Sequence, residues 1–126
     1  MPKALPVLDT TGPICCPPIS ADPITEDAAL EIALRLKALA DPVRVRLFSL
    51  ILTAEGGETC NCDMAGVVGL SDATVSHHLK ALREAGLIVG ERRGTWVYYS
   101  PIRAALVALA RVLDPAPARC PAAGPE

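Results

Sequence analysis

The chain has 126 residues, of which 51% are apolar, and its formal net charge is −2. This length suits a single domain, and the apolar content excludes a wholly disordered chain. The small negative charge excludes a uniformly basic nucleic-acid coat, but it leaves room for a local basic surface. The sequence has neither the roughly 18-residue apolar run of a membrane-spanning helix nor the pattern of a signal peptide, so we expect a cytoplasmic protein with no membrane partner.

Proline marks both ends of the chain. Six of the twelve prolines fall within residues 1–23 and four within 115–125. Because proline disfavours regular structure, we expect a flexible arm over residues 1–24, a folded domain over 25–114 and a flexible tail over 115–126. The arm carries an adjacent pair of cysteines, Cys15 and Cys16.

Two helices are predicted at the start of the folded domain. Residues 26–40 are rich in Ala, Leu and Glu, and Thr25 is a suitable N-cap. A second helix begins at Asp41-Pro42 and stops before Gly56-Gly57. Its apolar residues recur on one helical face, which consists of Val43, Leu47, Leu50, Ile51 and Ala54.

The next segment predicts two helices joined by a tight turn. A short helix is expected over residues 63–68, and a turn follows at Gly69-Leu70. Ser71 then caps a longer helix over residues 72–85, which Gly86 ends. The inward face of this longer helix consists of Val75, Leu79 and Leu82.

A β-hairpin and a last helix complete the domain. Residues 87–89 predict a short strand, 92–94 a turn of two arginines and a glycine, and 96–99 a returning strand rich in aromatics. We expect one or two of these aromatics to pack the hairpin against the body, and Gly94 to adopt a positive φ. The last helix is expected over residues 102–113, and its apolar face consists of Ile102, Leu106, Leu109, Ala110 and Leu113.

This order of elements predicts a winged helix-turn-helix, mainly α with a small β-hairpin. In that fold a short helix braces a reading helix, which enters the major groove of double-stranded DNA, and the hairpin wing reaches the adjacent backbone. Residues 71–103 hold five Lys and Arg against three Asp and Glu, a local excess of +2. A solvated helix face would also carry such residues. We expect Thr74, His77 and Ser76 to face base edges, and Ser71, Lys80 and the wing arginines to face phosphates. The candidate DNA-contact residues are Ser71, Thr74, Ser76, His77, Lys80, Arg83, Arg92 and Arg93.

Five cysteines stand at 15, 16, 60, 62 and 120, which is a poor disulfide framework for a cytosolic chain. Clustered thiols indicate a soft metal or redox sensing, although Cys60 or Cys62 could simply be a small buried residue. The C-x-C pair alone completes no tetrahedral site, and the arm pair is the obvious source of further sulfur. Three thiolates suit arsenite or antimonite, and four suit cadmium, lead or zinc. We do not expect an enzyme, because no His and Asp are placed to activate a cysteine nucleophile.

Three stretches resemble the ArsR/SmtB family of metal-responsive bacterial repressors. The reading helix and wing resemble it over SDATVSHHLKALREAGLIVGERRGTWVYYSP, the second helix over ALADPVRVRLFSLIL, and the thiol segment over ETCNCDM. The resemblance covers about residues 28–113. One departure is Asp72, where the family often has Gln and where a carboxylate cannot donate to a base or a phosphate.

The resemblance implies a homodimeric repressor that binds operator DNA without metal and is released by a thiophilic ion. Dimerisation would bury the apolar faces of the first and last helices and pair two reading helices on a palindromic operator. We expect As(III) or Sb(III) as the ion, with Cd(II) or Pb(II) as the alternative. The ligands would be Cys15, Cys16 and one of Cys60 and Cys62, without Cys120. A thiol-redox repressor of the same fold and a repressor that no metal regulates remain open.

Overall fold

The computed structural model describes Ile19 and residues 23–115. Within this part of the chain, helices and short strands follow one another as α1 (Glu26–Leu39), α2 (Pro42–Leu52), a 3-10 turn (Glu55–Gly57), β1 (Thr59–Cys60), α3 (Asn61–Val68), α4 (Asp72–Glu84), β2 (Ile88–Arg93), β3 (Trp96–Pro101) and α5 (Arg103–Val112). The predicted winged helix-turn-helix is confirmed. None of these helices is both long and apolar enough to span a bilayer.

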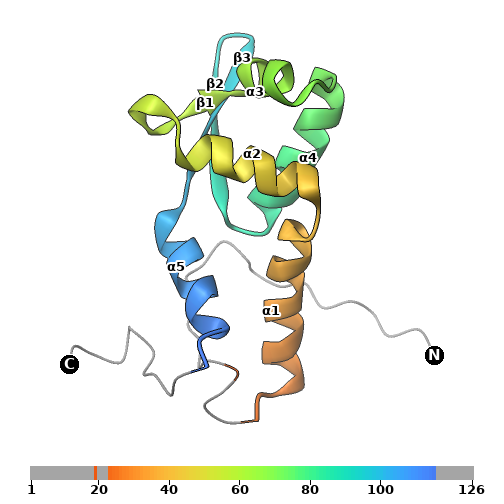
Figure 1. Ribbon diagram of the computed structural model, residues 1–126, viewed down its shortest axis with the longest axis vertical. Coiled ribbons are helices and arrows are strands. Elements are labelled where there is room, and N and C mark those ends of the chain that lie inside the picture. Colours follow the sequence, from red (N-terminus) through yellow and green to blue (C-terminus); the bar gives the residue numbers. More distant parts are fainter. Residues whose placement is uncertain (1–18, 20–22, 116–126) are drawn as a thin grey trace.

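The molecule has two parts (Figure 1). Helices α2, α3 and α4 surround the sheet at one end, whereas α1 and α5 run in opposite directions side by side at the other. The Arg103 guanidinium ties the start of α5 to α2, because it donates to the carbonyl of Leu52 at 2.9 Å. The Ile19 backbone N–H donates to the Val112 carbonyl at 3.0 Å, which fixes that point of the N-terminal segment at the far end of α5.

The predicted caps form at three helices. The side chains of Thr25, Asp41 and Ser71 accept hydrogen bonds from backbone N–H groups in the first turns of α1, α2 and α4. Pro42 occupies the first turn of α2, where its missing N–H costs no hydrogen bond. Gly86 has a φ of 78°, the left-handed conformation that ends a helix most easily at glycine.

The core forms around α4. Val75, Leu79 and Leu82 are fully buried, as predicted. Leu47 and Ile51 of α2 pack against this centre, together with Phe48, which lies outside the predicted face. Further buried residues come from α3, the sheet and α5, and these are Met64, Ala65, Leu87, Ile88, Tyr99, Leu109 and Val112.

Two helix boundaries differ from the prediction by two or more residues. Helix α2 ends at Leu52, because the chain turns through the 3-10 segment, in which Gly56 has a φ of 78°. Helix α3 begins two residues early, at Asn61 rather than 63. The cause is Cys60, whose sulfur accepts from the backbone N–H of Cys62 and caps the helix.

The sheet has one strand more than the predicted hairpin. β1 pairs with β3, so that the sheet has three strands in the order β1-β3-β2. Arg93 lies opposite Trp96, so the arginines belong to β2 and the turn begins at Gly94, with the expected positive φ of 67°. Pro101 is the last residue of β3, a strand end at which a missing N–H is tolerated.

Apolar side chains of α1 and α5 remain exposed. On α5 Val112 is fully buried although the sequence did not single it out, whereas Leu113 is 54% exposed. Val107 on α5 and Leu34 on α1 are 53% and 40% exposed. The described chain therefore leaves an apolar surface at the end of the molecule farther from the wing.

Candidate thiol site and nucleic-acid interface

Strand β1 and the start of α3 bring two cysteines together. Cys60 is 2% exposed and lies opposite Tyr98 of β3, whereas Cys62 is half-buried on the first turn of α3. A disulfide joins them, with the sulfurs 2.10 Å apart. The Cys62 N–H also donates to the Cys60 sulfur at 3.2 Å, so a helix terminus and a strand end hold this pair in place.

Reduction of this disulfide would create a soft-metal donor set. The sulfurs of Cys60 and Cys62 and a carboxylate oxygen of Asp63 lie within 4.8 Å of one another. Two thiolates and one carboxylate fit a thiophilic ion, because a metal binds the deprotonated thiol. An ion that is bound by three thiolates in a pyramid would need one further sulfur. The other predicted ligands, Cys15 and Cys16, lie outside the described residues, as does Cys120.

Asp63 is the member of this cluster that was not among the ligands predicted from the sequence. Its carboxylate is exposed and lies 4.0 Å from the Cys62 sulfur. The signal was present in the sequence, because Asp63 directly follows the C-x-C pair. The burial of Cys60 agrees with a small core residue, but the half-buried Cys62 and the exposed Asp63 keep the cluster open to solvent.

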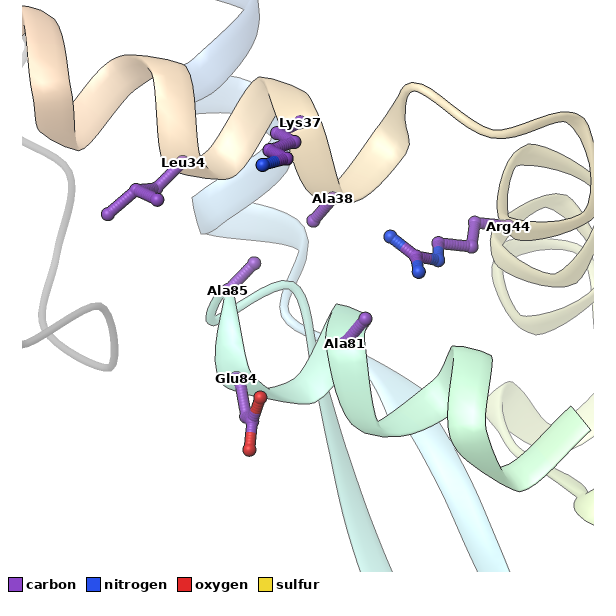
Figure 2. Close-up of a pocket in the computed structure, with 7 residues that line it drawn as sticks. All are labelled: Leu34, Lys37, Ala38, Arg44, Ala81, Glu84 and Ala85. Carbon is purple, nitrogen blue, oxygen red and sulfur yellow. The ribbon is translucent and has the colours of Figure 1, made fainter. Parts of the chain in front are cut away.

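Two hollows of about 410 Å³ flank the helices. The first lies beside the thiol cluster and has three acidic side chains; it is lined by Leu50, Thr53, Ala54, Glu55, Glu58, Thr59, Asp63, Met64 and Val67. The second lies between α1, α2 and α4 (Figure 2). Its lining includes three alanines and the charged residues Lys37, Arg44 and Glu84. The acidic lining of the first suits a cation better than an anion.

The reading helix presents most of the predicted DNA contacts on its outer face. Thr74, His77, Lys80 and Arg83 are exposed, and Ser76 is half-buried. The Ser71 hydroxyl caps α4, accepting from the Thr74 N–H and donating to its hydroxyl at 3.0 Å.

The adjacent histidines have different surroundings. His77 is exposed, whereas His78 is half-buried and its Nδ1 accepts from Arg44 Nε at 3.1 Å. This bond joins α4 to α2. Of the two, only His77 is therefore presented on the outer face of α4.

The two wing arginines also differ. Arg93 forms a bidentate ion pair with Glu58, contacts the Glu91 carboxylate at 2.7 Å and lies 4.7 Å from the centre of the Tyr98 ring. The Arg93 hydrogen bond holds the pKa of the Glu58 carboxyl below its usual value, and the two carboxylates raise the pKa of Arg93. Arg92 donates to the Gly94 carbonyl at 3.3 Å, and no carboxylate of the described residues pairs with it. Arg92 is therefore the wing cation that is free to meet a phosphate.

The sequence matches a known family and several curated proteins. The model of "Bacterial regulatory protein, arsR family" matches residues 41–89. A putative arsenical resistance operon repressor, ArsR2 of Halobacterium salinarum, is 32% identical over 86% of this chain and 87% of its own. The arsenic resistance transcriptional regulator ArsR1 of Pseudomonas putida is 46% identical over 50% of this chain. The matched region spans about half (48%) of the length of ArsR1. The cadmium resistance regulatory protein CadC homolog of Staphylococcus aureus is 41% identical over 56% of this chain and 57% of its own.

Solved structures agree with these matches. The AntR antimony-specific transcriptional repressor superposes with a TM-score of 0.59 at 30% identity, over 71% of this chain and 79% of that one. The homodimeric winged helix-turn-helix domain Mb0332 of Mycobacterium bovis gives 0.55 at 32% identity, over 74% and 82%.

Proposed function

Because the chain belongs to the arsR family of bacterial regulatory proteins, we propose that it is a transcriptional repressor that binds operator DNA as a homodimer. A thiophilic ion, arsenite or antimonite first, releases it from the DNA. The observation that carries the proposal is the position of the thiol pair. Cys60 caps α3, and α3 packs against the reading helix α4. An ion that re-orders the start of α3 therefore acts on the helix that braces the DNA-reading surface.

Homodimerisation is supported by the exposed apolar residues of α1 and α5. Leu34, Val107 and Leu113 leave apolar surface that a second copy of the chain would remove from water. A two-fold dimer would also present two reading helices to the half-sites of a palindrome. The related Mycobacterium bovis domain is described as homodimeric.

The choice of ion follows from the supply of thiolates. The described residues offer two sulfurs, and the arm pair would raise the number to three or four. Three sulfurs match trivalent arsenic or antimony, whereas four would favour Cd(II) or Pb(II). Relatives named for arsenic, antimony and cadmium all occur among the matches, and one of the arsenic proteins matches over 86% of the chain.

The arm has a restricted reach while Ile19 stays bonded to α5. Two residues separate Cys16 from Ile19, so the chain length limits Cys16 to a reach of about 11 Å from Ile19. The ten residues of α5 extend about 15 Å away from the sheet that carries Cys60 (Figure 1). An arm that completes the site must therefore leave α5, or come from the partner subunit of a dimer.

The disulfide supports a second candidate, a thiol-redox repressor. Cys60 and Cys62 are bonded to each other in the described structure, so oxidation and ion binding would act on the same segment. An oxidant should then release DNA without any ion, and a reductant should restore binding.

Titrating the DNA-bound protein with single ions tests the proposed function. A DNA duplex that the reduced protein binds would first be selected and labelled with a fluorophore. The anisotropy of the labelled duplex in the complex would then be followed during titration with arsenite, antimonite, cadmium, lead and zinc, and with hydrogen peroxide in a separate series. We expect release by arsenite or antimonite at the lowest concentration. Release by peroxide alone would favour the redox candidate, and indifference to every addition would leave a repressor without thiol regulation.

The wing offers a direct test of DNA contact. Replacing Arg92 with Ala should weaken binding to all sequences about equally and lower the slope of log affinity against log salt by about 1, because one phosphate contact is lost. The matched change Arg93→Ala, compared with the Cys60–Cys62 disulfide intact, should alter the slope less, since two carboxylates neutralise Arg93 in that form. Equal slopes for the parent and the Arg92 variant would remove this residue from the interface.

A further inference from the structure

We propose that the ion pair between Glu58 and Arg93 couples the thiol site to the wing, and that Glu58 competes with DNA phosphate for Arg93. This inference rests on the proposed function, because it assigns the residues through which that function would operate. Its basis is a juxtaposition that the chain order alone does not suggest: the wing's second arginine is bound to a carboxylate 35 residues away, beside the thiol pair.

Two sets of neighbouring residues connect the thiol site to Arg93. Along the chain, Glu58 is in an extended conformation (φ −152°, ψ 158°) and precedes Cys60 by two residues, so their Cα atoms are about 6.6 Å apart. Across the sheet, Cys60 lies opposite Tyr98, and the ring of Tyr98 carries the Arg93 guanidinium at 4.7 Å. Cys60 is therefore linked, along the chain and across the sheet, to the carboxylate and the ring that contact Arg93.

The ion pair also has the chemistry of a competitor. A carboxylate that accepts two parallel N–H bonds from an arginine offers the arrangement that a phosphate offers. Both side chains are accessible, at 44% for Arg93 and 36% for Glu58, so the guanidinium can exchange one anion for the other. The pair is formed in the structure in which the two sulfurs are joined. Joined sulfurs, whether by a disulfide or by a shared ion, thus correspond to an Arg93 withdrawn from DNA.

Three variants separate coupling from simple electrostatics. Glu58→Gln removes the competitor, and Arg93→Gln removes the contested cation. Glu91→Gln is the matched control, because Glu91 also binds Arg93, at 2.7 Å, but belongs to the wing itself. All three residues are at the surface, and circular dichroism would confirm the fold of each variant.

The measured quantity is the ratio of the DNA dissociation constants with and without arsenite. Glu58→Gln should lower this ratio about two- to fivefold, the range of an exposed ion pair, by tightening the binding with arsenite present. Arg93→Gln should lower it by a similar factor, by weakening the binding without arsenite. The double variant should fall no further, because both changes remove the same interaction. The Glu91 variant should keep the parent ratio.

Two outcomes would overturn the coupling. One is a Glu58→Gln ratio equal to that of the parent, and the other is an equal fall of the ratio in the Glu91 variant. Arsenite affinity without DNA, followed by thiolate absorbance, would show that each variant still binds arsenite.

Trp96 tests the same link without DNA. It is the single tryptophan of the chain, lies opposite Arg93 and is 44% exposed. Its emission should change when dithiothreitol reduces the parent's Cys60–Cys62 disulfide, and this change should fall by more than half in Glu58→Gln; an equal change in both proteins would refute the coupling. If arsenite fails to release the parent from DNA while the emission result holds, the proposed function fails and the coupling stands.

Discussion

Replacing both Cys15 and Cys16 with Ser should leave DNA binding intact and raise the arsenite concentration needed for half-release by more than about a hundredfold. The loss of groups that merely orient a metal ligand already costs 10–100-fold in affinity, and here two of three ligands would be removed. The reading helix and wing contain neither residue, so affinity for DNA without arsenite should match the parent. Anisotropy titration of the DNA complex with arsenite measures both quantities.

The remaining cysteines supply the controls. Cys62→Ser should behave like the double variant, because Cys62 is half-buried and lies beside the exposed Asp63, whereas Cys60 is 2% exposed. Cys120→Ser should respond like the parent. Parent-like release of the Cys15→Ser, Cys16→Ser protein would show that the arm supplies no ligand. The site would then have to be built from the cysteines at 60, 62 and 120.

Replacing Val107 with Glu should abolish the dimer and weaken DNA binding by at least about a hundredfold. Val107 is 53% exposed on α5, so a carboxylate there is solvated in the monomer but would be buried in a dimer that covers this surface. A monomer binds only one half-site. In a dimer, binding of the first reading helix raises the effective concentration of the second one at the other half-site, and a monomer loses this gain. Sedimentation equilibrium and anisotropy measure the two effects.

The matched control is Val45→Glu. Val45 is 52% exposed on α2, so the substitution and the starting exposure are nearly the same, but the residue belongs to neither α1 nor α5. This variant should remain dimeric. Leu106→Glu would be a less discriminating test, because Leu106 packs partly against the core and its loss would also destabilise the fold. A dimer that survives Val107→Glu would place the subunit interface elsewhere.

The helices of this fold could be predicted because their signals are local. Thr25, Asp41 and Ser71 each act on N–H groups two or three residues ahead, and Val75, Leu79 and Leu82 follow the helical period. Strand β1 could not be predicted in this way. It has two residues, too few to show an alternation, and it forms because β3 offers a partner almost forty residues along the chain.

The site was predictable in its residue types more than in its contacts. The C-x-C pair indicated sulfur chemistry, and the structure brings both sulfurs and Asp63 together. The partners of Arg93 could not be read from the sequence, because an arginine in a wing has the same local pattern whether it meets a phosphate or a carboxylate. Tertiary structure assigns it to Glu58 and leaves Arg92 as the free cation.

The most direct test of the central claim measures the competition from the side of the ion. Arsenite affinity of the reduced protein would be determined from thiolate absorbance, once without DNA and once with saturating operator duplex. Because linkage is reciprocal, DNA should weaken arsenite binding by the same factor by which arsenite weakens DNA binding, within a range of about 5–150-fold. Equal arsenite affinities with and without DNA would contradict the claim that thiol-bound ions release this protein from its operator.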